Sequence, residues 1–217
     1  MGRQITALKV QEHNRERVNV YLDGEFAFGL ARIVAAWLQV GQDLSDEKMA
    51  ALLAEDGQEK AYQQALEFLS YRPRSEAEVQ KNLRDHVIPE AVIAETIERL
   101  QRNGLVDDSA FAQAWVENRN TFRPRSRRAL AAELRQKGLS SEIIAESLQA
   151  VDEEALAYQM ALKQVRKLQD LKWPEFRRKL TGQLARRGFA YDTIASAVER
   201  VWAEIRSANN AGDHPEM

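Results

Sequence analysis

The hydrophobic pattern divides the chain into a short N-terminal part of strand character and a long helical remainder. Apolar and polar residues alternate from Val18 to Leu22, which is the pattern of a half-buried strand. Asp23-Gly24 follows, and then the apolar run Phe26–Phe28. An Asp-Gly pair between two such runs predicts a β-hairpin with a type I′ turn, because both central residues of that turn need positive φ. The segment Ile5–Val10 provides a third strand.

Two short helices are expected after the hairpin. Leu30–Val40 is followed by Gly41, and Ser45–Glu55 is followed by Gly57, so each segment has a glycine where a helix ends. An isolated hairpin is marginally stable, so this small sheet must pack on the helical segments after it. We assign residues 1–57 to this N-terminal part.

From about residue 58 the chain is helical and repeats itself. The sequence Tyr71-Arg72-Pro73-Arg74-Ser75 returns as Phe122-Arg123-Pro124-Arg125-Ser126, a shift of 51 residues. A shift of 50 then carries Pro124 onto Pro174 and Gly138 onto Gly188, and the apolar positions keep the same register. Units of this length that cannot bury their own apolar faces stack on one another.

Each unit is predicted to hold three helices. They are Gln58–Ser70, Ser75–Val87 and Pro89–Asn103 in the first; Ser109–Thr121, Ser126–Lys137 and Ser140–Ala150 in the second; and Glu153–Leu171, Pro174–Arg187 and Asp192–Ser207 in the third. The fold class is therefore mainly α: a tandem array of three three-helix repeats at 58–106, 107–151 and 152–207, after a small N-terminal sheet and two short helices. Residues 208–217 carry no apolar pattern and are predicted to be a disordered tail.

The helix ends carry their own signals. Ser75 with Glu78 forms a capping box, and Gly138 and Gly188 supply the left-handed residue that ends a helix. Asp107-Asp108 lies between two predicted helices. A two-metal nuclease needs several converging carboxylates, and an Asp in this position more often caps the next helix.

Composition excludes several classes of function. The 217 residues include no cysteine and three scattered histidines, which argues against disulfides, thiol catalysis and a metal site. No phosphate-binding glycine loop occurs, no apolar stretch approaches the ~20 residues of a membrane span, and no signal core follows the first residues. We therefore expect a cytoplasmic protein that is not an enzyme and binds no cofactor, metal, membrane or small-molecule substrate.

The net charge of −2 conceals two basic patches. Residues 119–137 hold seven basic residues against Glu133 alone, and residues 163–187 hold nine against Asp170 and Glu175. Residues 1–60, in contrast, hold seven basic residues against ten acidic ones. Because patches govern what a surface attracts, the second and third units are candidates for a polyanionic partner.

Three ordered motifs follow one another in the helical part: Ala65–Ser75, Asn103–Asp108 with Phe111-Ala112, and Arg125-Ser126 leading to Leu134–Gly138. Within a match of about residues 60–202, they resemble the RecX family, the regulators of the bacterial recombinase RecA. The N-terminal hairpin and its two helices lie outside this match. The third unit departs from the pattern, since Trp173-Pro174-Glu175 replaces Arg-Pro-Arg.

The resemblance implies a part in DNA recombination, DNA repair and the SOS response. RecX proteins bind the RecA filament on single-stranded DNA and suppress its ATPase and strand-exchange activities. On this basis the candidate nucleic-acid and filament-binding residues are Arg72, Arg74, Arg123, Arg125, Arg127, Arg128, Arg135, Lys137, Lys172, Arg177, Arg178, Lys179, Arg186 and Arg187. Clustered Lys and Arg side chains bind phosphates without sequence preference.

Alternatives remain open at this stage. The basic clusters are also explained by solvated helix faces, or by a helical scaffold that binds only acidic proteins. Most aromatic residues have helical spacing and are expected in the core, while Trp173 and Phe122 stand next to turn prolines and basic residues and are candidates for base stacking. The sequence does not choose between capping a filament and coating it, or between a hairpin that buttresses the first unit and one that offers an edge strand to a partner.

Overall fold

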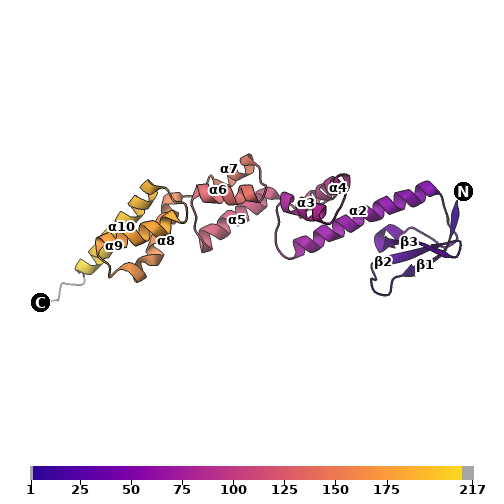
Figure 1. The fold of residues 1–217 in the computed structure, drawn as a ribbon, viewed down its shortest axis with the longest axis horizontal. Helices are drawn as coiled ribbons and strands as arrows, with labels where there is room; N and C mark the ends of the chain where they lie inside the picture. Colours follow the sequence, from indigo (N-terminus) through magenta and orange to yellow (C-terminus); the bar gives the residue numbers. More distant parts are fainter. Residues whose placement is uncertain (1, 212–217) are drawn as a thin grey trace. The chain divides into compact units, whose positions relative to one another are not determined.

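The computed structural model describes the backbone of residues 2–211 and the side chains of residues 2–207. The chain forms two compact units, Met1–Val106 and Asp107–Met217. The first unit contains a small antiparallel sheet and one three-helix repeat, and the second contains two more repeats (Figure 1). The predicted fold class, a mainly helical array of three such repeats with a small N-terminal sheet, is confirmed. The predicted limits of the individual segments stay a prediction.

Within the described residues the sheet has four strands in the order β3-β2-β1-β4. They are β1 (Arg3–Val10), β2 (Arg17–Leu22), β3 (Glu25–Ala31) and β4 (Asp43–Leu44). The hairpin between β2 and β3 is confirmed, because Asp23 and Gly24 have φ values of 52° and 90°. Val20 and Leu22 are fully buried, as the alternation predicts.

The two helices predicted after the hairpin are both wrong in extent. Leu30 belongs to β3, and the helix that follows, α1 (Arg32–Ala35), is a single turn. The helix predicted to end near Gly57 does not end there, because α2 (Asp46–Ser70) runs through it without a break. A glycine inside a helix costs only about 1 kcal/mol. Burial of Leu52 in the sheet core on one side of it and of Ala61 in the repeat core on the other outweighs that cost.

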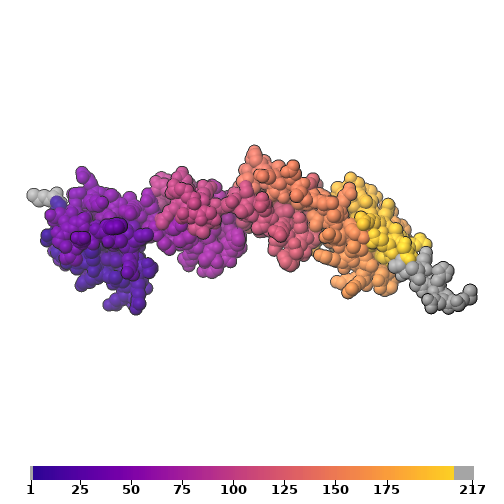
Figure 2. Space-filling view, turned by 180° about the vertical axis from the view of Figure 1, so that it is seen from behind, coloured from indigo at the N-terminus to yellow at the C-terminus, as the bar shows by residue number. Residues whose placement is uncertain are grey.

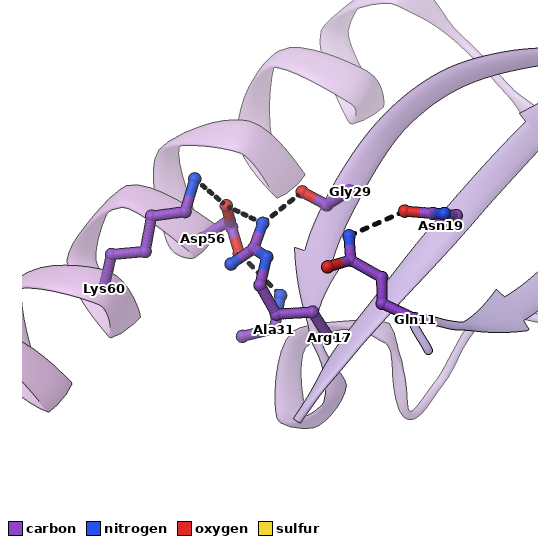
Figure 3. Close-up of polar contacts among 7 residues, drawn as sticks. All are labelled: Gln11, Arg17, Asn19, Gly29, Ala31, Asp56 and Lys60. Atoms are coloured by element: carbon purple, nitrogen blue, oxygen red, sulfur yellow. Dashed lines mark hydrogen bonds and ion pairs between the residues drawn. The ribbon is translucent and has the colours of Figure 1, made fainter. Parts of the chain in front are cut away.

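A buried carboxylate ties the sheet to α2 (Figure 3). The Asp56 side chain accepts hydrogen bonds from the Arg17 guanidinium (3.2 and 3.3 Å) and from the Ala31 backbone N–H (2.6 Å), and pairs with Lys60 at 2.8 Å. Arg17 also donates to the Gly29 carbonyl (2.7 Å). Burial alone would raise the pKa of Asp56, but the donors and charges of Lys60, Arg17 and the Ala31 amide outweigh it and hold the pKa below its usual value.

The three repeats have the predicted helix order. The helices are α2, α3 (Glu76–Asp85) and α4 (Glu90–Arg102); α5 (Asp108–Phe122), α6 (Arg127–Gln136) and α7 (Ser141–Leu148); and α8 (Glu153–Leu168), α9 (Trp173–Ala185) and α10 (Tyr191–Ala211). The helix α10 continues to Ala211, past residue 208, where the predicted tail begins. The rest of the predicted tail, 212–217, lies outside the described residues.

The predicted caps form as expected. Ser75 and Glu78 make a capping box, and Asp107 accepts from the Ala110 N–H at 2.9 Å, so its carboxylate caps α5. Gly138 and Gly188 have φ values of 82° and 89° after α6 and α9. The equivalent position after α3 is Val87, which adopts φ 59° although a β-branched side chain strongly disfavours that conformation.

The cores follow the division into units. In the first unit, one apolar cluster joins the sheet to Leu52 and a separate cluster fills the first repeat. In the second unit a single cluster extends from Phe111 to Val201, so the second and third repeats share one core. Figure 2 shows the orange and yellow surface of the third repeat adjoining the red surface of the second.

Candidate nucleic-acid interface

The second unit brings together two arginine-rich segments that are far apart in sequence. The Ser126 N–H, at the start of α6, donates to the Arg187 carbonyl at the end of α9 (3.1 Å). Gly188 packs so closely here that a Cβ atom on it would lie 2.7 Å from the Ser126 Oγ. The start of α6 and the end of α9 are therefore neighbours, and Arg127 lies beside the backbone of Arg187.

Arg127 and Arg128 line an open groove between α6 and α7. Its other lining residues are Ala131, Ala145, Glu146, Leu148 and Gln149. The Arg127 guanidinium donates to the Gln149 carbonyl at 2.8 Å, which fixes its direction without neutralising its charge. Arg128 is exposed. Both side chains are therefore exposed at the start of α6, where the Arg127 backbone N–H itself donates to the Glu153 carboxylate (3.1 Å).

The third repeat has a second basic depression. Arg186 and Arg187 line it between α8 and α9, together with Met160, Gln164 and Gln183. On the opposite end of α9 the Arg177 guanidinium donates to the Tyr191 hydroxyl at 3.3 Å. Lys172, Arg178 and Lys179 are exposed.

Two of the candidate cations in the second repeat make contacts within the fold. Arg125 lies 2.9 Å from Glu133, and the same carboxylate accepts from Arg119 and from the Trp115 Nε1–H, each at 2.8 Å. Lys137 lies over the Trp115 ring, 5.2 Å from its centroid. Burial would raise the pKa of Glu133. The hydrogen bonds from Arg119 and Trp115 and the charges of Arg119 and Arg125 outweigh this effect and lower the pKa. The one carboxylate in this basic segment therefore neutralises part of its charge, which the sequence did not reveal.

The arginines of the first repeat are also engaged. Arg72 donates to the Glu78 carboxylate at 2.9 and 3.3 Å, and Glu78 is also the residue that completes the capping box. Arg74 stacks on the Phe68 ring, 4.0 Å from its centroid. Glu76 and Glu78 occupy the places that Arg127 and Ala129 take in the second repeat. The first repeat thus presents a nearly neutral surface where the second is cationic.

The candidates therefore separate into two groups. Arg72, Arg74, Arg125 and Lys137 make contacts inside their own repeats. In the part of the chain that the structure describes, no carboxylate pairs with the side chains of the others: Arg123, Arg127, Arg128, Arg135, Lys172, Arg177, Arg178, Lys179, Arg186 and Arg187. All ten belong to the second unit.

The two aromatic candidates, Trp173 and Phe122, differ in their exposure to solvent. Trp173 is partly buried and packs against Phe176 and Trp202, with ring centroids 6.3 and 5.2 Å apart, so it belongs to the core. Phe122 is 74% exposed. Tyr71, its equivalent in the first repeat, has the same exposure, a feature that the repeat alignment already contained.

Among the described residues, no group of three or more His, Asp or Glu side chains is arranged to hold a metal ion. None of the helices in that part of the chain has the length and apolar character of a membrane span.

Comparisons with known proteins agree over most of the chain. Models of the first, second and third three-helix domains of RecX match residues 61–100, 107–148 and 152–198. The model of the RecX N-terminal domain matches residues 3–45, so the hairpin, which sequence reasoning left outside the resemblance, is part of the family's architecture.

Individual relatives give the same result. The regulatory protein RecX of Bacillus velezensis is 34% identical over 204 residues, covering 90% of this chain and 76% of that protein. RecX of Bacillus subtilis is 32% identical over 202 residues, covering 91% and 76%. A crystal structure of a regulatory protein RecX superposes with a TM-score of 0.72 at 28% identity, covering 91% of this chain and 99% of that one. With its N-terminal sheet and three three-helix domains in the order of these relatives, the chain belongs to the RecX family of regulatory proteins.

Proposed function

We propose that this protein is a non-catalytic regulator that binds the RecA filament on single-stranded DNA and suppresses its ATPase and strand-exchange activities. The family name supports regulation of RecA, and the second unit supports contact with a polyanion. Such a regulator would act in the cytoplasm, where the DNA is.

The observation that carries the DNA contact is the hydrogen bond between Ser126 and Arg187. It joins the start of α6 to the end of α9, so Arg127 and Arg128 of the second repeat and Arg186 of the third belong to one packed body. Phosphates neutralised by several such cations release counterions, which gives affinity that falls steeply with salt. Ten cationic side chains that no carboxylate pairs with in the described residues suit that kind of binding.

Inhibition would be steric and conformational. A protein held against neighbouring subunits of the filament resists the motions that ATP turnover requires, because it binds one arrangement of the subunits better than the other. No group in the protein then needs to act on ATP or DNA chemically.

The direct test is the ATPase activity of RecA on single-stranded DNA with increasing amounts of this protein. We expect progressive inhibition as the protein approaches a stoichiometric ratio to RecA. Full ATPase activity at that ratio would overturn the proposal.

A protein-binding scaffold without DNA contact is the second candidate, and the first unit favours it locally. There Arg72 is neutralised by Glu78, and Arg74 lies against Phe68. Fluorescence anisotropy with labelled single-stranded DNA across a salt series separates the candidates. Regulation by DNA and filament contact requires binding that weakens with salt, while a pure scaffold shows no binding even at low salt.

A further inference from the structure

Two repeats present an aromatic ring to solvent at the same position. Tyr71 follows the last residue of α2 and Phe122 is the last residue of α5, and Arg-Pro-Arg-Ser follows each of them. Each ring is 74% exposed. Burying such a ring would stabilise the fold, so packing within the repeat does not explain why both are left uncovered.

Each ring stands on a rigid support. The residues after it enter a turn that contains Pro73 or Pro124, and the turn ends at Ser75 or Ser126, which is fully buried and caps the next helix. The backbone that carries each ring is held by this turn, so little backbone freedom is lost when a partner covers the ring. Exposed, preorganised aromatic side chains are typical anchors of protein interfaces.

The charges around the two rings differ, which indicates the class of partner. Beside Tyr71, Arg72 is neutralised by Glu78. Beside Phe122, Arg123 is exposed and has no carboxylate partner among the described residues. A nucleic acid would find only the second setting favourable, whereas an apolar pocket on a protein accepts the ring in both.

The third repeat lacks this feature. The shift of 50 residues places Lys172 where the second repeat has Phe122, and the neighbouring Trp173 packs into the core against Phe176. The exposed ring is therefore a property of the first and second repeats, and the most basic repeat is the one without it.

We propose that Tyr71 and Phe122 are equivalent protein-binding anchors, each inserting into the same apolar pocket on one protomer of a polymeric protein partner. The inference rests on the proposed function, in which that partner is the RecA filament. Equivalent anchors on successive repeats suit a filament, because a filament offers the same pocket once on every protomer. Binding through both anchors raises the overall affinity well above that of either alone.

The test uses Tyr71→Ala, Phe122→Ala and the double variant in the full-length chain. Tyr71→Phe keeps a ring at the first position. Trp37→Ala is the control, because Trp37 is an exposed aromatic residue (88%) in the N-terminal part of the chain, outside the candidate interface. Affinity for assembled RecA–single-stranded DNA filaments and for bare single-stranded DNA is measured for each, together with the thermal unfolding midpoint.

We expect each single alanine variant to weaken filament binding about tenfold and the double variant about a hundredfold. Bare-DNA binding and the unfolding midpoint should stay unchanged, and Tyr71→Phe and Trp37→Ala should bind filaments like the parent protein. Unchanged filament binding in the double variant, or an equal loss with Trp37→Ala, would contradict the role proposed for Tyr71 and Phe122. An equal loss of bare-DNA affinity would assign the rings to base stacking and also contradict that role. Failure of the parent protein itself to bind filaments would refute the proposed function, and the anchors with it.

Discussion

At the scale of single residues, Val87 is the most strained position in the first repeat. It ends α3 at φ 59°, and its side chain is 89% exposed, so nothing is gained from packing in return. The left-handed conformation costs a residue with a Cβ about 1–2 kcal/mol, and glycine avoids this cost while losing more entropy on folding. We expect Val87→Gly to raise the free energy of unfolding by about 1 kcal/mol, as measured by urea denaturation.

The reverse substitution can be made at the equivalent position of the second repeat. Gly138 has φ 82° at the equivalent position, so Gly138→Val should destabilise the protein. A less stable Val87→Gly variant would show that the strain argument is wrong.

Asp56 should make stability depend on pH. Its folded pKa is lowered, so the carboxylate stabilises the fold fully above its unfolded pKa of about 3.9, and this contribution is lost as pH falls towards the lower folded value. Asp56→Asn leaves Arg17 without a counter-ion inside the unit and should cost about 3 kcal/mol at neutral pH. Urea denaturation between pH 7 and pH 3 should show the difference from the parent protein shrinking as pH falls.

Glu90 supplies the control for Asp56. Its pKa is lowered by the hydrogen bond from Arg84, but both side chains are largely exposed. Exposed ion pairs contribute little, so Glu90→Gln should change stability far less than Asp56→Asn at every pH. A constant difference between the Asp56 variant and its parent across the series would contradict the role assigned to this carboxylate.

At the scale of elements, the start of α6 is expected to contribute most to DNA binding. Arg127→Glu with Arg128→Glu reverses two cations that line the α6–α7 groove. The variant should bind single-stranded DNA and RecA filaments at least about tenfold more weakly, because each lost phosphate contact also removes a counterion-release contribution. Anisotropy at several salt concentrations should show a shallower salt dependence as well.

The matched control reverses two cations of α3, the equivalent helix in the first repeat. Lys81→Glu with Arg84→Glu makes the same change in charge on a helix whose first turn is acidic. It should have a clearly smaller effect on both kinds of binding. Equal losses in the two variants would defeat the assignment of DNA contact to the second unit.

At the scale of the whole molecule, the two units are expected to fold separately. The second unit has one core from Phe111 to Val201, and the apolar clusters of the first unit end at Val106. A fragment of residues 107–217 should therefore give a helical circular dichroism spectrum and unfold cooperatively. A fragment of residues 152–217 should be far less stable, since it divides the shared core. An unfolded 107–217 fragment would contradict this division of the cores.

Local signals made much of the fold predictable. The sequence predicted the hairpin, the caps at Ser75 and Asp107, and the helix ends at Gly138 and Gly188. Each of these features depends on residues within one turn of one another. The bounds of α1 and the continuity of α2 across Gly57 were not predicted. Gly57 has the residue type of a helix stop, but two separate cores keep α2 continuous across it.

The sequence predicted which basic residues belong to the candidate site, but not which of them are exposed and unpaired. The sequence identified the arginines, but it did not show that Glu133 neutralises Arg125 or that Glu78 holds Arg72. It also ranked Trp173 with Phe122, although one is packed in the core and the other is exposed. Which charged or aromatic side chain finds a partner depends on which helix faces it after packing.

By itself, then, the sequence determined the repeat, the order of its helices and the total charge of each segment, since periodicity and capping operate over a few residues. Only the tertiary structure decided that Ser126 meets Arg187, that Asp56 joins the sheet to α2, and which arginines remain available to a partner. The physical reason is the distance along the sequence over which each interaction acts. Backbone propensities act within a turn, whereas these contacts join residues 8 to 61 positions apart and exist only when packed helices bring them within hydrogen-bonding distance.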